Sequence, residues 1–156
     1  MGDDRNIRIA FLNNDNDELL IYGPGDQEYP KISPDSRYVA YQSDETGDVR
    51  VMVFDRETNF ARDVLEAGAT RPAWTRDGKS MYYIRDGNLY RKGVQTAKGF
   101  SMTGQERLIY EDGYTFYYDE MPDGRIVIAR EADRNESTLN ITLNWTERLK
   151  AAAGER

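Results

Sequence analysis

The sequence predicts an all-β chain built from repeated four-stranded antiparallel sheets. The first observation is an internal repeat, because residues 30–41 are echoed by residues 72–83, 42 positions later. The second is a weaker third copy over residues 118–128. The third is the common plan of the copies, in which a polar turn leads into a short apolar strand. Short strands that repeat every 40 to 50 residues or so are typical of a β-propeller.

Each four-stranded repeat of a β-propeller is called a blade. The first element of this chain is half of one blade. Residues 6–12 and 18–22 are expected to form two strands before the first repeat turn. They match the third and fourth strands of a blade, so residues 6–28 are a partial blade. The loop over residues 13–18 is rich in oxygen ligands, but it lacks the Gly and Glu positions of an EF-hand loop. A hairpin loop is therefore favoured over a calcium site.

The repeat turns come next, and their residues have defined backbone roles. A proline presets φ at the first corner in two copies, and an aspartate in all three can bind the backbone two residues on. Glycine accepts positive φ in the second and third copies. Ser36 takes that place in the first copy, which predicts a strained or different turn. The structural turn residues are Ser33, Pro34, Asp35, Asp77, Gly78, Pro122, Asp123 and Gly124.

Two complete blades follow from these turns, over residues 29–67 and 70–111. Each has a second hairpin, and Asp86-Gly87 is the strongest short hairpin signal in the chain. We expect second strands at residues 38–41 and 81–84, third strands at 49–54 and 89–94, and outermost strands at 61–65 and 106–110.

The last element is a second partial blade over residues 113–145. Strands are expected at residues 126–129 and 138–144. Residues 145–153, which include three consecutive alanines, are expected to form a short C-terminal helix. The chain is thus predicted to be a single β-propeller-type domain over residues 6–150.

Composition argues against several functions. The net charge is −7, whereas nucleic-acid binding needs a clustered basic surface. The chain has no His and no Cys, so it lacks the commonest general base, the thiol nucleophile and most zinc ligands. No apolar run is long enough for a membrane span or a signal peptide. We expect no nucleic-acid partner, no membrane insertion, no metal and no cofactor.

No catalytic residue is predicted. The sequence contains no Gly-x-Ser-x-Gly elbow, P-loop or dinucleotide-binding fingerprint. Neighbouring carboxylates could serve glycosidic chemistry, but they fall at expected turns and strand ends, where Asp is common. They are Asp15, Asp17 and Glu18, Asp44 and Glu45, Glu111 and Asp112, and Asp119 and Glu120. The chain is therefore expected not to be an enzyme.

Aromatic residues crowd the later repeats. They are Tyr82, Tyr83, Tyr90, Tyr110, Tyr114, Phe116, Tyr117 and Tyr118. Packing between blades is the more common role for such residues in a propeller, and an exposed patch for a partner is the alternative. Candidate interface residues are Trp74, Tyr90, Tyr117 and Trp145.

Residues 33–44 resemble the repeat of TolB-type propellers, in which a Ser-Pro-Asp-Gly turn precedes a strand that ends in Ser-Asp. Residues 74–79 are a looser copy. Residues 121–125 and 140–149 are similar to the closing segment of bacterial propeller and sensor proteins that end in an Asn-Trp-x-x-x-Leu helix. The resemblance covers about residues 7–150 and implies the propeller fold. It also implies relatives that are often periplasmic or extracytoplasmic.

The unfinished blades predict self-association. They leave sheet faces uncovered and strand edges unpaired. The simplest result is a symmetric dimer, in which the half blade of one copy completes the truncated blade of the other in a ring of about six blades. The first functional hypothesis is a non-enzymatic interaction or scaffold module that binds itself and possibly another protein. The alternative is a small-ligand or cation-binding sensor propeller of a bacterial signalling or Tol–Pal-like system. A hydrolytic propeller ranks last.

Overall fold

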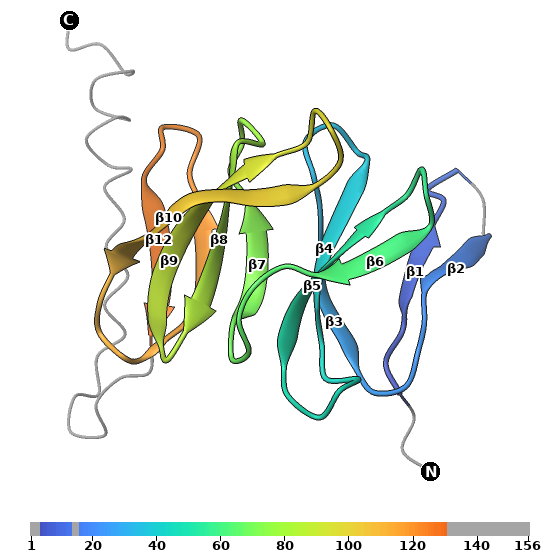
Figure 1. Ribbon diagram of the computed structural model, residues 1–156, viewed down its shortest axis with the longest axis horizontal. Helices are drawn as coiled ribbons and strands as arrows, with labels where there is room; N and C mark the ends of the chain where they lie inside the picture. The colour runs from blue at the N-terminus through green and yellow to red at the C-terminus, as the bar shows by residue number, and fades with distance from the viewer. Residues whose placement is uncertain (1–3, 14–15, 131–156) are drawn as a thin grey trace, which may run out of the picture.

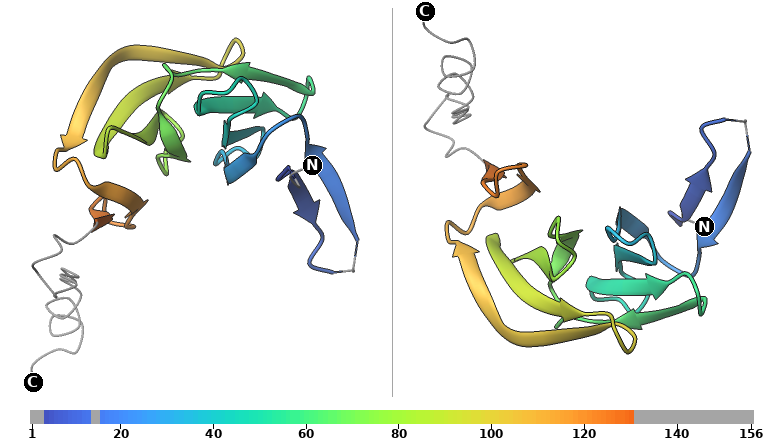
Figure 2. Two further views of the ribbon diagram at one scale, coloured as in Figure 1. Left: turned by 90° about the horizontal axis from the view of Figure 1, so that it is seen from below. Right: turned by 90° about the horizontal axis from the view of Figure 1, so that it is seen from above.

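The computed structural model describes residues 4–13 and 16–130, which form an arc of four antiparallel sheets (Figures 1 and 2). The strands within these residues are β1 (Ile7–Ala10), β2 (Asp17–Ile21), β3 (Gln27–Ile32), β4 (Tyr38–Ser43), β5 (Arg50–Asp55), β6 (Phe60–Asp63), β7 (Thr70–Trp74), β8 (Ser80–Arg85), β9 (Asn88–Gln95), β10 (Ser101–Tyr110), β11 (Thr115–Glu120) and β12 (Ile126–Arg130).

The four sheets follow one another along the chain. The second sheet has the order β3-β4-β5-β6, and the third runs from β7 to β10 in the same way. The first sheet is β1-β2 and the fourth is β11-β12, and we call these two the terminal half sheets. In Figure 2, β3 and β7 lie on the inner side of the arc, whereas β6 and β10 lie on its outer side. This confirms the predicted fold class of two complete and two partial blades.

Three apolar cores lie between successive sheets. The largest separates the second and third sheets and includes Tyr38, Val53, Trp74, Met81 and Phe100. The others join the first sheet to the second and the third sheet to the fourth. Because successive side chains of a strand point to opposite faces, β4 sends Tyr38 to one core and Tyr41 to another. Strands buried on both faces explain why these segments read as continuous apolar runs.

Most strand ends differ from the sequence prediction by one or two residues, and the outermost strands of the complete sheets show the clearest differences. β6 ends at Asp63 rather than at residue 65. β10 begins at Ser101 rather than at residue 106, because its first residues still pair with β9. The register then shifts between Thr103 and Arg107, where Gly104 has a φ of 67°. A glycine bulge of this kind lets one long strand continue past an irregularity that sequence reasoning takes for a loop.

The strand predicted at residues 138–144 and the helix predicted at residues 145–153 lie outside the described residues. In the part of the chain that the structure describes, no helix is long and apolar enough to cross a membrane.

Candidate functional site

The predicted turn residues lie between the first and second strands of the second, third and fourth sheets. In the first turn, the Asp35 carboxylate accepts hydrogen bonds from Ser33 Oγ at 2.5 Å and from the Arg37 amide at 3.1 Å. Asp77 accepts the same pair of bonds from Thr75 Oγ1 at 2.6 Å and from the Lys79 amide at 3.0 Å. These contacts hold the chain reversal, so the turns fix the strands rather than offer free groups for catalysis.

The third turn keeps only part of this plan. The Asp123 carboxylate accepts a hydrogen bond from the Arg125 amide at 3.1 Å, and Met121 stands where the other turns have Ser or Thr. Gly78 and Gly124 have φ values of 67° and 82°, and Ser36 at the matching position has a φ of 62°. Ser36 therefore adopts the glycine-like conformation despite its side chain.

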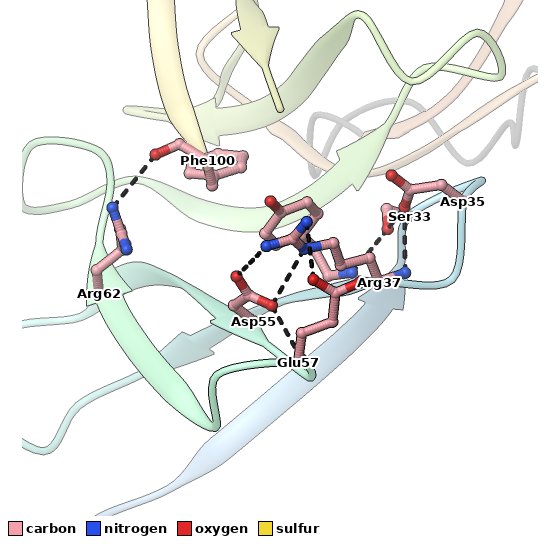
Figure 3. A network of polar contacts seen from close by, with 8 residues as sticks. Ser33, Asp35, Arg37, Asp55, Glu57, Arg62 and Phe100 are labelled. Atoms are coloured by element: carbon pink, nitrogen blue, oxygen red, sulfur yellow. Dashed lines mark hydrogen bonds and ion pairs between the residues drawn. The ribbon is translucent and has the colours of Figure 1, made fainter. Parts of the chain in front are cut away.

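An ion-pair network stands beside the first turn (Figure 3). The Arg37 guanidinium donates two hydrogen bonds to the carboxylate of Asp55, at 3.2 and 2.9 Å, and pairs with Glu57 at 2.9 Å. It also lies 5.0 Å from the ring centroid of Tyr38. Hydrogen bonds from Arg37 hold the pKa of Asp55 below its ordinary value and so keep the buried carboxylate ionised. The network joins the turn to the end of β5 and was not predicted from the sequence.

The candidate interface residues separate into buried and exposed groups. Trp74 is buried in the core and donates a hydrogen bond from Nε1 to the Lys31 carbonyl at 2.9 Å, so it packs within the chain. Tyr90 is half-buried and stacks on Tyr83 with a centroid distance of 5.9 Å. Tyr117 is 48% exposed. Trp145 lies outside the described residues.

The aromatic residues of the later repeats also separate into buried and exposed groups. Tyr82, Tyr83 and Tyr118 are buried between sheets, whereas Phe116 and Tyr117 on β11 and Tyr114 just before it are exposed. Burial and a bond to Glu106 raise the pKa of Tyr83. The three exposed side chains thus belong to the last described sheet and to the residue just before it.

The terminal half sheets each have one packed face and one open face. In the first sheet, Ile7 and Ile21 pack against the second sheet. In the fourth sheet, Tyr118 packs against the third sheet, while Tyr117 and Val127 remain exposed. Within residues 4–13 and 16–130, β1 pairs only with β2 and β12 pairs only with β11. As far as the described residues go, each half sheet therefore has an unpaired edge beside apolar side chains, which is the arrangement that strand addition uses.

A cavity of about 560 Å³ opens beside β3, on the side of the first sheet. Arg5, Arg8, Glu28, Tyr29 and Pro30 are among its lining residues. In the first half sheet, only the strands matching the third and fourth positions of a blade stand next to β3. The cavity therefore lies between β3 and the residues that lead into β1.

Tyr29 and Arg71 were also missed by sequence reasoning. Both precede a proline, and both have positive φ values, of 53° and 52°. A bulge interrupts the strand pairing at each of them. The two residues are 42 positions apart, which is the repeat offset, so the sequence could have shown that they occupy equivalent positions. No sequence signal indicated their left-handed backbone conformation.

The described residues contain no group of three or more Asp or Glu side chains arranged to hold a metal ion. The oxygen-rich loop over residues 13–18 lies partly outside the described residues.

Comparison with known proteins identifies related propellers. A family described as the prolyl oligopeptidase N-terminal beta-propeller domain matches residues 27–122. The structure of TolB from Acinetobacter baumannii is 21% identical and superposes with a TM-score of 0.63, over 83% of this chain and 32% of that one. The beta-propeller domain of the Trilobed protease from Pyrococcus furiosus, described as having an open velcro topology, is 18% identical with a TM-score of 0.53, over 85% of this chain and 43% of that one.

The putative TolB from Agrobacterium tumefaciens is also similar, with 15% identity and a TM-score of 0.51 over 66% of this chain and 40% of that one. The chain thus spans less than half the length of these structures. Comparison with curated proteins found no significant match. These findings confirm the TolB-like propeller resemblance, and at such identities they establish the fold rather than an activity.

Proposed function

Because this chain belongs to the family of prolyl oligopeptidase N-terminal β-propeller domains, we propose that it is a non-enzymatic protein-interaction module that assembles with itself through its terminal half sheets. The observation that carries the proposal is the complementary strand position of the two half sheets. One supplies the outer half of a blade and the other supplies the inner half.

The strand order makes the complementarity specific. In both complete sheets the second strand pairs with the third, as β4 pairs with β5 and β8 with β9. β12 holds the second position of its sheet, and β1 holds the third position of its own. Pairing β12 of one copy with β1 of another would rebuild the order β11-β12-β1-β2. Two copies would then close a ring of six blades, with three from each copy.

The open faces support the same pairing. In the rebuilt blade, the face that carries Tyr117 and Val127 would continue the face that carries Ile7 and Ile21. That face already packs against the second sheet. The rebuilt blade would thereby cover two side chains that are now 48% and 40% exposed. Strand addition supplies main-chain hydrogen bonds, and the burial of these apolar side chains adds a hydrophobic driving force.

Sedimentation equilibrium of the 18.0 kDa chain tests the proposal. We expect a concentration-dependent mass that approaches twice that of the chain. Tyr117→Lys and Leu19→Lys should each weaken the dimer at least about tenfold, because each places a charge on an open face of a terminal half sheet. Leu108→Lys is the matched control, since Leu108 is exposed on the outer strand β10.

A chain that stays monomeric at about 100 µM would overturn the self-assembly proposal; a protein pair of that affinity has a binding free energy of only about −5.5 kcal/mol. Equal weakening by Leu108→Lys would show that added charge, rather than the half-sheet faces, controls association.

A further inference from the structure

Tyr29 of β3 and Arg71 of β7 hold equivalent places in adjacent sheets. Each comes directly before a proline on the innermost strand, and each has a left-handed backbone. A left-handed backbone is unfavourable for residues other than glycine, and it persists only where the surrounding structure enforces it. Such positions concentrate at binding and catalytic sites.

The backbone of Arg71 is held by side chains from two other strands. Its amide donates a hydrogen bond to Gln42 Oε1 at 3.4 Å, and its carbonyl accepts one from the Tyr118 hydroxyl at 2.6 Å. Gln42 is itself anchored through a bond from Nε2 to Glu28 Oε2 at 3.2 Å. Strands β4 and β11 therefore fix the strained residue from both sides, which orients its side chain in advance of any ligand.

The guanidinium of Arg71 lies over the ring of Tyr29, with 4.3 Å between its carbon and the ring centroid. Tyr29 is 36% exposed and Arg71 is half-buried. Among the residues that the structure describes, no carboxylate forms an ion pair with Arg71, and the nearby Glu28 is engaged by Arg5. Arg37, Arg50 and Arg85, in contrast, are all paired with acids.

A guanidinium stacked on an aromatic ring keeps its in-plane N–H donors free for a planar acceptor. A carboxylate matches two of these donors at once, which gives a bidentate bond. The neighbouring ring and Pro30 offer an apolar surface for the carbon atoms beside that carboxylate. The net charge of −7 disfavours polyanions such as nucleic acid at the same place.

We propose that Arg71 and Tyr29 form a binding site on the inner side of the arc for the carboxylate of a short peptide. The residues that build it all come from one copy of the chain: Arg71, Tyr29, Pro30, Gln42 and Tyr118. The site therefore does not depend on the self-assembly proposed above. Its chemical requirement is a planar two-oxygen anion next to an apolar side chain.

Titration of the full chain with short peptides, followed by NMR of the arginine Nε–Hε groups, tests the proposal. Acetyl-Gly-Gly-Phe with a free terminus should shift the Arg71 resonance saturably, and its amide should not. Acetyl-Gly-Glu-Gly-amide against acetyl-Gly-Gln-Gly-amide distinguishes a side-chain carboxylate from a chain terminus. The Arg71 resonance is assigned as the one that is missing from the spectrum of the Arg71→Lys variant. No shift with either carboxylate, or equal shifts with the neutral peptides, would overturn the proposal.

Variants give a second measurement by calorimetry. Arg71→Gln should weaken carboxylate binding at least about tenfold, since it removes the charged donors that would bind the carboxylate. Arg71→Lys keeps the positive charge but loses the planar pair of N–H donors that a carboxylate can bind at once, so it should also weaken binding. Arg107→Gln on β10 makes the same change of net charge at an exposed site and should leave affinity unchanged. A parallel loss in Arg107→Gln would assign binding to net charge and overturn the site.

Discussion

Tyr118 of β11 donates a hydrogen bond from its hydroxyl to the backbone carbonyl of Arg71 on β7, with 2.6 Å between the two oxygens. The bond links the fourth sheet to the third at one of the residues with a left-handed backbone. Tyr118 is also buried against Tyr82, with the rings edge-on at 6.1 Å. This contact therefore ties a two-stranded half sheet to the strained inner strand of its neighbour.

Tyr118→Phe is expected to lower the free energy of unfolding by about 1–2 kcal/mol, because the Arg71 carbonyl loses its donor. Urea denaturation followed by circular dichroism measures the change. Tyr38→Phe is the comparison, since the buried Tyr38 hydroxyl has no hydrogen-bond partner among the described residues. Removal of the Tyr38 hydroxyl should leave the free energy of unfolding unchanged or raise it by about 1 kcal/mol. Equal losses in both variants would contradict the role of the Tyr118 bond.

The ion pair of Arg37 with Asp55 should make stability sensitive to acid. Because Arg37 lowers the pKa of Asp55 in the folded chain, the stabilisation is fully present above the unfolded carboxyl pKa of about 4. It is lost as the pH falls through the folded pKa. Asp55→Asn should therefore flatten the dependence of unfolding free energy on pH below about 4. Asp48→Asn, at an exposed loop position, is the control and should keep the wild-type slope.

Buried tyrosines should limit stability at the alkaline end. Burial raises the pKa of Tyr38, Tyr41, Tyr82, Tyr83 and Tyr118, and it raises that of Tyr41 to about 12. A raised folded pKa gives stability that is present in full below the unfolded value of about 10 and is lost as the pH rises further. Tyrosinate absorbance and circular dichroism, recorded together, should show these groups ionising as the chain unfolds. Their ionisation near pH 10 in a chain with a native spectrum would disprove this.

The four-sheet plan could be predicted because its signals are local. An aspartate at a turn and a glycine or serine one position later determine where β3, β7 and β11 reverse into their partners. The long β10 was not predicted, since Gly104 carries a bulge that breaks the apparent strand. Local sequence signals predict each hairpin turn. They do not predict a β-bulge inside a strand, because β10 continues past the bulge only by pairing with β9.

The partners of individual side chains could not be predicted in the same way. Trp74 and Tyr117 look alike in the sequence, as aromatic residues on first strands of their repeats. Trp74 is buried because a complete sheet lies beside it, where it meets Phe100 edge-on at 5.8 Å. Tyr117 is exposed because it faces away from the third sheet. The stacking of Arg71 on Tyr29 likewise depends on how two sheets align, which no local pattern encodes.

Ser36 provides a direct test of strain in the repeat turns. It has a φ of 62° where Gly78 has 67°, so the same turn exists in this chain with and without a side chain. A left-handed backbone costs a non-glycine residue roughly 1–2 kcal/mol, partly offset by the greater flexibility of unfolded glycine. Ser36→Gly should therefore raise the free energy of unfolding by about 0.5–1 kcal/mol.

The reverse substitution, Gly78→Ser, should lower the free energy of unfolding by at least about 1 kcal/mol. A Cβ at Gly78 would stand 3.6 Å from Pro34, an ordinary contact, so the loss would come from φ rather than from a clash. The Ser36 carbonyl would keep its bond from Arg56 in Ser36→Gly, because that bond uses only backbone oxygen. Thermal and urea unfolding of both variants measure the effect. If both substitutions shift stability in the same direction, the left-handed conformation is not what distinguishes the two turns.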